Sequence, residues 1–258
     1  LYFRDGGPII AIQLDNEVPA ENANAAGYRY MSALKQLALR CGIDAPLYTV
    51  TGWGGVVPED DVIPTWGAYP EAPWEQHSNE LPPSDNYCFF NRRWVPGIGT
   101  DLGLNAMASD DQTDLVSRHP FLTVEMGGGQ QITYHRRPVV TAKDVLGPVY
   151  TRVGMGANSM GYYVFHGSQH PLSDDLSYPT QESRATHYLN DYPMISYDFQ
   201  APLSEWGFPR AYLNDFRLMH MFLTDFAPVL APMTSTLADY APDVANTEKL
   251  RHAVRSRS

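Results

Sequence analysis

The sequence is poor in the features that mark disulfide-bonded, metal-binding, membrane-spanning or nucleic-acid-binding proteins. It has only two cysteines, Cys41 and Cys88, too far apart for a metal or redox motif, so we expect both to be buried thiols. No apolar run approaches the about 20 residues that a membrane-spanning helix needs. With 18 Lys and Arg against 29 Asp and Glu, the net charge of −11 disfavours nucleic acid and membrane surfaces as partners.

An initiating methionine is also missing, because the first residue is Leu1. A signal peptide therefore cannot be judged, and secreted, periplasmic, lysosomal and cytoplasmic locations all stay open. The composition is that of a globular protein, with 43% hydrophobic residues, and 258 residues can bury a substantial core. The 21 prolines and 16 tyrosines indicate long, aromatic-rich loops over a regular scaffold.

The most informative segment is the apolar run from Gly6 to Leu14, which ends abruptly in Asp15-Asn16-Glu17. An uninterrupted apolar run is typical of a strand that is buried on both faces of a parallel sheet. Strict alternation would place Gln13, Asp15 and Glu17 on one face of this strand. Polar groups that gather at the carboxyl end of a strand are typical of catalytic barrels.

Strand and helix patterns alternate along the rest of the chain. Helical periodicity predicts helices at 24–41, 141–158 and 210–230, the second with Thr141 as N-cap and Asp144 at the third helical position. Short apolar runs predict strands at 45–50, 62–66, 121–125, 160–165 and 194–199. This alternation indicates an α/β fold and favours a barrel over a doubly wound sheet.

A second glutamate, Glu125, ends the predicted strand 121–125 in the same way that Glu17 ends the first strand. Alternation places Phe121, Thr123 and Glu125 on one face, so both glutamates are predicted to point into the same barrel mouth. Two converging carboxyl groups are the apparatus of glycoside hydrolysis. The alternative is a pair of strand-end acids that cap loops or bind arginine.

Six sequence blocks follow one another in the order of a known enzyme family: Gly6–Glu17, Thr51–Gly54, Gly67–Trp74, Val124–Gly129, Asn158–Gly167 and Ser196–Leu203. Together they resemble family 35 glycoside hydrolases, the β-galactosidase family, over residues 1–233. The resemblance implies a (β/α)8 TIM barrel of which about strands four to eight are present. It also implies that this part alone folds poorly and has little activity, and that 234–258 is a linker or tail towards a following domain.

The resemblance also implies roles for four residues. Glu17 matches the general acid/base, Glu125 the nucleophile, Asn16 the amide that binds the sugar 2-hydroxyl, and Tyr163 a tyrosine of the galactose subsite. The implied reaction is retaining removal of terminal non-reducing β-D-galactose from oligosaccharides or glycans, without metal or organic cofactor. Nucleic acid and membrane insertion are not expected, and the oligomeric state stays open.

Several departures from the family pattern surround the expected sugar site. Val18-Pro19 replaces Tyr-Gly after the acid/base, and Phe199 stands where a tyrosine is expected. These changes keep two alternatives open: a non-catalytic galactoside-binding relative, and a related β-glycosidase with a different sugar preference. His166 and His170 have i, i+4 spacing but no evident third ligand, so we expect no metal site. Trp53, Trp66, Tyr69 and Trp74 could form stacking platforms or pack beneath the long loop.

Overall fold

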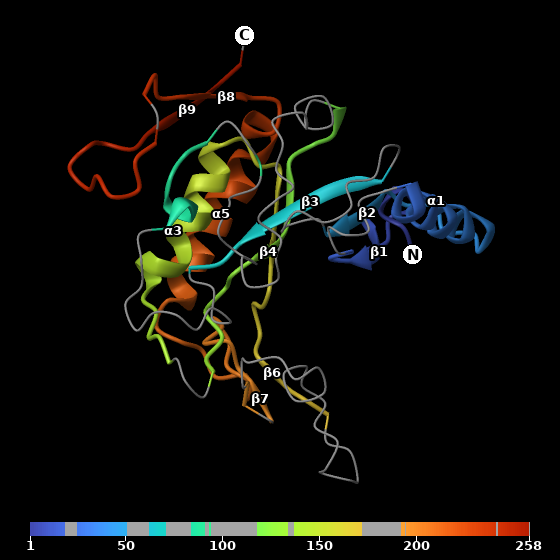
Figure 1. Cartoon of the computed structure of the whole chain (residues 1–258), viewed down its shortest axis with the longest axis horizontal. Helices are drawn as coiled ribbons and strands as arrows, with labels where there is room; N and C mark the ends of the chain where they lie inside the picture. Colours follow the sequence, from blue (N-terminus) through green and yellow to red (C-terminus); the bar gives the residue numbers. More distant parts are fainter. Residues whose placement is uncertain are drawn as a thin grey trace.

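A computed structural model describes residues 1–18, 25–50, 62–70, 84–90, 93, 118–133, 137–171, 192–193, 195–240 and 242–257. Its centre is a five-stranded sheet (Figure 1), made of β1 (Ile12–Asn16), β2 (Leu47–Val50), β3 (Ile63–Ala68), β4 (Leu122–Met126) and β5 (Ser159–Tyr162). All neighbours are parallel, and their spatial order is their order in the chain. The predicted α/β fold with a parallel sheet is therefore confirmed.

Three long helices accompany the sheet. Helix α1 (Ala25–Arg40) follows β1 and joins it to β2, and its Met31 packs with Val18 and Val62. Helices α3 (Ala142–Gly154) and α5 (Leu213–Leu230) lie together on another part of the sheet (Figure 1). The predicted cap of α3 is present, since Thr141 and Asp144 form a capping box.

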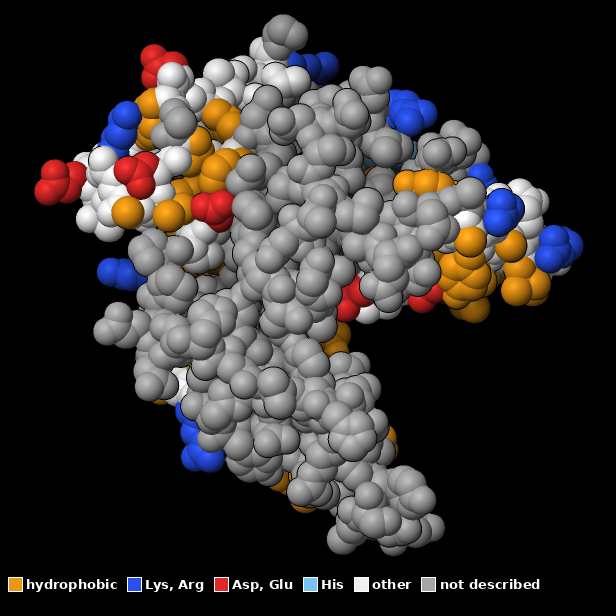
Figure 2. Space-filling view, viewed as in Figure 1, with side chains coloured by type: hydrophobic (Ala, Val, Ile, Leu, Met, Phe, Trp, Pro, Cys, Tyr) orange, Lys and Arg blue, Asp and Glu red, His pale blue; other side chains and the backbone are white. Residues whose placement is uncertain are grey.

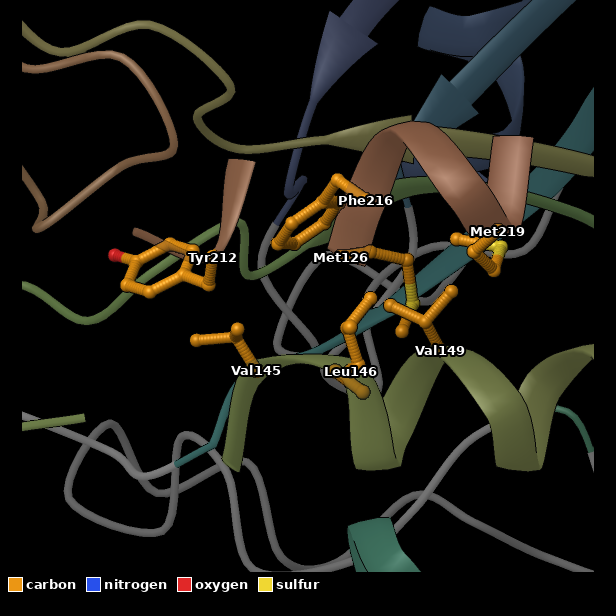
Figure 3. Close-up of a cluster of buried hydrophobic side chains, with 8 residues drawn as sticks. Met126, Val145, Leu146, Val149, Tyr212, Phe216 and Met219 are labelled. Atoms are coloured by element: carbon orange, nitrogen blue, oxygen red, sulfur yellow. The ribbon is translucent and has the colours of Figure 1, made fainter. Parts of the chain in front are cut away.

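The main hydrophobic core lies between β4, α3 and α5. Figure 3 shows Met126 from β4 between side chains of the two helices, and all of the following are buried: Ala68, Met126, Val145, Leu146, Val149, Tyr212, Phe216 and Met219. Alternation along β4 places Met126 on this helical side and Glu125 on the opposite side. The core therefore fixes the face on which Glu125 lies.

Three predicted strands differ from the structure: the first strand, 160–165 and 194–199. Strand β5 ends at Tyr162, so Tyr163 lies just after the strand and not on it. The first strand begins at Ile12 and not at Gly6, because the preceding residues form a 3-10 turn, η1 (Phe3–Asp5), closed by a bridge between Tyr2 and Ile9. The predicted strand 194–199 does not extend the parallel sheet. Its residues Ser196–Tyr197 form β7, which pairs antiparallel with β6 (Ser168–Gln169) in a separate two-stranded sheet.

Residues 234–257, expected to be a linker or tail, form a second antiparallel pair, β8 (Thr234–Leu237) with β9 (Ala253–Ser256). Arg255 anchors this pair by donating hydrogen bonds to the carbonyl oxygens of Val153, Ala157, Leu230 and Met233. These carbonyls lie at the carboxyl ends of α3 and α5, where helices carry unsatisfied acceptors and favour a cation. The polar composition gave no sign of this anchor.

The two cysteines differ in their surroundings. Cys88 is buried, as expected, but Cys41 is exposed because it lies in the turn just after α1. Both thiols are free. Among the described residues, no helix has the length and apolar character that crossing a bilayer requires.

Candidate active site

Strand β4 places Glu125 in the interior, where the residue is only 8% exposed. Its strand neighbour Met126 points the other way, into the helical core (Figure 3). Glu125 and Met126 thus lie on opposite sides of β4, although the pairing of β4 with β3 and β5 shifts register between Thr123 and Met126. Gly67 of β3 lies directly beside it, since a Cβ at Gly67 would be 2.6 Å from the Cβ of Glu125. Because Gly67 has no side chain, there is space beside it for the side chain of Glu125.

A tyrosine that sequence reasoning left as a possible stacking platform is the direct partner of Glu125. The Tyr69 hydroxyl donates a hydrogen bond to Glu125 Oε2 at 3.2 Å, and the ring is buried. Tyr69 directly follows β3, the parallel neighbour of β4, so the ends of the two strands bring the pair together. The sequence places Tyr69 close to the end of a predicted strand, and this was the available signal for a site residue. Only the order of the strands in the sheet shows that its hydrogen-bond partner is Glu125.

The ionisation of Tyr69 shows which charges lie around it. Its pKa is well above the ordinary value, first because the ring is buried, then because the charge of Glu125 and next that of Glu17 disfavour a phenolate. Tyr163 and Tyr197 contribute in the same direction. Both predicted catalytic glutamates and the predicted subsite tyrosine therefore lie within electrostatic range of one buried phenol.

Glu17 reaches this place by a different route from the one that alternation predicted. A bulge interrupts the pairing of β1 with β2 between Gln13 and Asn16, and the Asp15 carboxylate accepts a hydrogen bond from Tyr30 on α1 at 2.7 Å. Glu17 itself lies after the strand with φ of +48°, in the left-handed region. The prediction that strict alternation orients Glu17 is wrong, because the bulge and the left-handed residue break the period.

Asn16 ends β1 and lies next to Glu17 in the chain. Its Oδ1 accepts a hydrogen bond from Gln13 Nε2 at 3.0 Å, and its main-chain N–H donates to Asp15 Oδ1 at 2.7 Å. The side chain is thus held by its own strand and remains exposed. The amide is therefore exposed, one residue before Glu17 in the chain.

Aromatic residues form a wall beside the carboxylates. Tyr163 directly follows β5, and its hydroxyl lies 2.7 Å from that of Tyr197. The Phe199 ring lies 5.5 Å from that of Tyr163, 4.9 Å from that of Tyr197 and 6.3 Å from that of Tyr69. Phe199 is buried. A tyrosine at this position would therefore place its hydroxyl inside the wall.

The loop behind the wall is tied by the Asp198 carboxylate. Its Oδ2 pairs with the Arg210 guanidinium at 2.5 Å, and its Oδ1 accepts the Glu205 N–H at 2.8 Å. Asp198 is the neighbour of Tyr197 in the chain, so this ion pair fixes the position of Tyr197 against Tyr163. The aromatic wall is therefore held in place by contacts within the protein itself.

No group of three His, Cys, Asp or Glu side chains in the part of the chain that the structure describes is placed to hold a metal ion. His166 Nδ1 donates to the Gly167 carbonyl oxygen, and the His170 ring packs against Tyr197 at 4.7 Å. These two histidines flank β6 and do not lie on a helix, where an i, i+4 pair would share one face. The described groups that act on the Tyr69 hydroxyl are the carboxylates of Glu125 and Glu17 and the phenols of Tyr163 and Tyr197.

A separate cavity of about 490 Å³ lies between Cys88–Phe90 and the loop that joins β8 to β9. Its lining includes one carboxylate, Asp243, and none of the four predicted site residues. Glycoside hydrolysis needs two carboxyl groups across the scissile bond. The candidate active site is therefore the region around Glu125, Glu17 and Tyr69.

Comparison with known proteins adds no assignment. No protein-family model matches this sequence, and no curated protein shows significant similarity to it. The candidate site rests on the residues and contacts described above.

Proposed function

We propose that this chain carries the catalytic site of a retaining exo-β-galactosidase that resembles family 35 glycoside hydrolases. The observation that carries the proposal is the hydrogen bond from the buried Tyr69 hydroxyl to Glu125, and the charge of Glu17 also raises the pKa of this phenol. Paired carboxyl groups with one held by a hydrogen-bond donor are the arrangement that glycoside hydrolysis uses. The substrate class is a β-galactoside oligosaccharide or glycan.

In the proposed reaction, Glu125 attacks the anomeric carbon while Glu17 donates a proton to the leaving oxygen. The C–O bond to the leaving group breaks as the bond to Glu125 forms, which gives a covalent galactosyl-enzyme. Glu17, now a carboxylate, takes a proton from water, and the resulting attack releases galactose with retained configuration. This mechanism requires carboxyl groups about 5–5.5 Å apart.

The neighbouring residues have distinct parts in this proposal. Tyr69 donates to Glu125 Oε2 and so favours the ionised carboxylate that must attack. Asn16, which is exposed, would bind the 2-hydroxyl, and Tyr163 would contact the galactose ring through the aromatic wall. Each of these roles supports charge or orientation at the reacting carbon.

We also propose that the sheet is strands four to eight of a (β/α)8 TIM barrel. Its strands follow one another in chain order with parallel pairing, whereas a doubly wound sheet reverses its order at a switch point. Among the described strands, β1 and β5 each have one neighbour, so both edges could accept further strands. Barrel closure would then bring the β1 end towards the β5 end and enclose the site.

The proposal is tested by replacing Glu125 in the full-length protein. We expect Glu125→Ala to abolish release of the aryl group from an aryl β-galactoside, because the nucleophile is gone, and azide to restore release with formation of a galactosyl azide. The exposed Asp215→Ala on α5 is the matched control and should retain activity. Unchanged hydrolysis by Glu125→Ala would overturn the proposal.

A mechanism-based fluorosugar gives an independent test. A 2-fluoro-galactoside should leave a covalent adduct on the peptide that contains Glu125, detected by mass spectrometry, because the second step is slowed more than the first. Binding of galactose without turnover or adduct would instead identify a non-catalytic galactoside-binding relative.

A further inference from the structure

Asn86 lies far from Glu125 in the chain but is bonded to the residue that holds Glu125. It belongs to η3 (Asp85–Tyr87) and is 1% exposed. Its Nδ2 donates to the main-chain carbonyl oxygen of Tyr69 at 3.0 Å, and its Oδ1 accepts from Arg152 Nη2 at 2.9 Å. The amide of Asn86 thus connects helix α3 to the backbone of Tyr69.

Helix α3 has a face that is shaped to receive the segment 84–90. Gly147, Thr151 and Gly154 follow i, i+4, i+7 spacing and therefore share this face. A Cβ at Gly147 would lie 2.6 Å from the Tyr87 ring, and one at Gly154 would lie 2.5 Å from the Phe89 ring. Between them, Thr151 Oγ1 lies within hydrogen-bond distance of two carbonyl oxygens, that of Asn86 at 2.9 Å and that of Pro148 at 2.7 Å.

This close fit has an energetic cost that indicates a constraint. A glycine inside a helix is less favourable than alanine, and α3 has Gly147 in its interior and Gly154 as its last residue on the face that contacts the segment. The segment gains a further attachment from the Tyr87 hydroxyl, which donates to the carbonyl oxygen of Asp144 at 2.9 Å. The position of Asn86 is therefore fixed at several points along α3.

Arg152 strengthens the same connection. The residue is fully buried, and its guanidinium reaches Asn86 Oδ1 and, through Nη1, Thr151 Oγ1 at 3.4 Å. A buried guanidinium must keep its hydrogen bonds, because leaving its charge unsatisfied is strongly unfavourable. Moving Asn86 away would therefore disturb Arg152 as well as Tyr69.

We propose that Asn86 is a positioning residue for the nucleophile, acting through Tyr69 and supported by Arg152 and the glycine face of α3. This inference rests on the proposed function. The backbone of Tyr69 sets the distance from its hydroxyl to Glu125 Oε2, and that hydrogen bond favours the ionised, attacking carboxylate. Asn86 touches neither substrate nor reacting atoms.

The test compares Asn86→Ala, Tyr69→Phe and the double variant in the full-length protein. We expect Asn86→Ala to lower kcat by about 10²-fold, since a small misplacement near the chemistry has effects of that size, with a smaller change in KM. The acidic limb of the kcat/KM profile should move to higher pH in Asn86→Ala and in Tyr69→Phe. In the double variant the two effects should not add, because they act through one contact.

Two further variants separate positioning from general destabilisation. Val145→Ala, in the core of α3 away from the segment, should lower thermal stability but leave the acidic limb unchanged. Gly147→Ala should displace the Tyr87 ring and move the limb in the same direction as Asn86→Ala, to a smaller extent. If Asn86→Ala does not fold, Gly147→Ala supplies the same comparison. An unmoved acidic limb, or full additivity with Tyr69→Phe, would overturn the inference.

A measurement that needs no activity distinguishes this inference from the proposed function. With 3-fluorotyrosine at position 69, the fluorine resonance should shift in Glu125→Gln and also in Asn86→Ala. A shift in the first variant without one in the second would overturn the role of Asn86, whatever the enzyme activity. Absence of any β-glycosidase activity in the wild type would instead overturn the proposed function.

Discussion

The two proposed catalytic glutamates occupy opposite settings in one sheet. Glu125 lies on β4, which has neighbours on both sides, and its carboxylate is held by the buried Tyr69. Glu17 follows β1, which has one neighbour among the described strands, and is positioned by a bulge and a left-handed residue. The interior strand fixes its acid by packing, whereas the edge strand fixes its acid by local backbone conformation.

The side chains around the two strands differ in burial: those packed against β4 are buried, whereas some of those near β1 are exposed. Near β4 the core between α3 and α5 is closed, whereas near β1 Ile10 is 65% exposed. Figure 2 shows hydrophobic side chains gathered on the surface over α1, where Tyr30, Leu37 and Leu39 are exposed. These settings suit the proposed roles, because a nucleophile must stay ionised and fixed while an acid/base must exchange its proton with substrate and water.

Among the variants that test this difference between interior and edge strands, Glu17→Gln is expected to have the largest effect on turnover. Loss of the acid/base should lower turnover of galactosides with poor leaving groups by about 10²–10⁴-fold, the usual contribution of such a group. With an activated aryl leaving group, the first step needs little acid, so a galactosyl-enzyme on Glu125 should accumulate because no base activates water.

Stopped-flow measurement of an aryl burst, followed by mass spectrometry of the quenched protein, would detect this intermediate. Asp44→Asn is a suitable control, because Asp44 is exposed and lies before β2, at the opposite end of the strand from the site. A normal steady state in Glu17→Gln would mean that the edge glutamate is not the acid/base.

A smaller but clear effect should appear in stability. Met126→Ala removes a fully buried side chain from the interior core and should lower the free energy of unfolding by about 2–5 kcal/mol. Leu14→Ala, on the edge strand, removes a side chain that is only partly buried and should have a clearly smaller effect. Urea unfolding followed by tryptophan fluorescence would compare the two, and equal losses would contradict the difference between edge and interior.

The same contrast explains how far the sequence alone could predict this molecule. The apolar runs that end at Glu17 and Glu125 predicted both strands, and Glu125 and Met126 lie on opposite sides of β4 although its pairing with β3 and β5 shifts register between Thr123 and Met126. Alternation failed at Glu17, because neither the bulge in β1 nor the left-handed conformation has a sequence signal here. Both strands shift register close to their glutamates, so local periodicity located the two acids but did not by itself orient them.

Long-range contacts were beyond sequence reasoning for a different reason. The bond from Tyr69 to Glu125 joins residues 56 positions apart, and that from Arg152 to Asn86 joins residues 66 apart. Arg255 binds carbonyls up to 102 positions away. No local pattern encodes which partner such a side chain meets, since the partner depends on strand order and helix packing. The resemblance supplied candidate residues, and the structure supplied their partners, such as Tyr69 for Glu125 and Tyr197 for Tyr163.

The smallest effect on stability is expected for a variant of His220. Its ring lies beside the main hydrophobic core, where Nε2 is 2.9 Å from the hydroxyl of Tyr162 on β5. Burial lowers the pKa of His220, because it disfavours the charged ring. In the unfolded chain the ring takes up its proton near pH 6.5, and in the folded protein at a lower pH. Between these values the unfolded state binds more protons, so stability must fall as the pH falls.

Replacing His220 by Gln should therefore remove part of the loss of thermal stability between pH 7.5 and pH 5.5, on the order of 1 °C. The measurement is the difference in Tm between the two pH values for wild type and variant, with His252→Gln on the exposed loop before β9 as the matched control. Well above pH 6.5 the ring is neutral in both states, so wild type and variant should then show no difference in their dependence on pH. A variant that loses as much stability as the wild type would show that the interior does not hold His220 neutral. The contrast between interior and edge would then rest on packing and not on the protonation of buried groups.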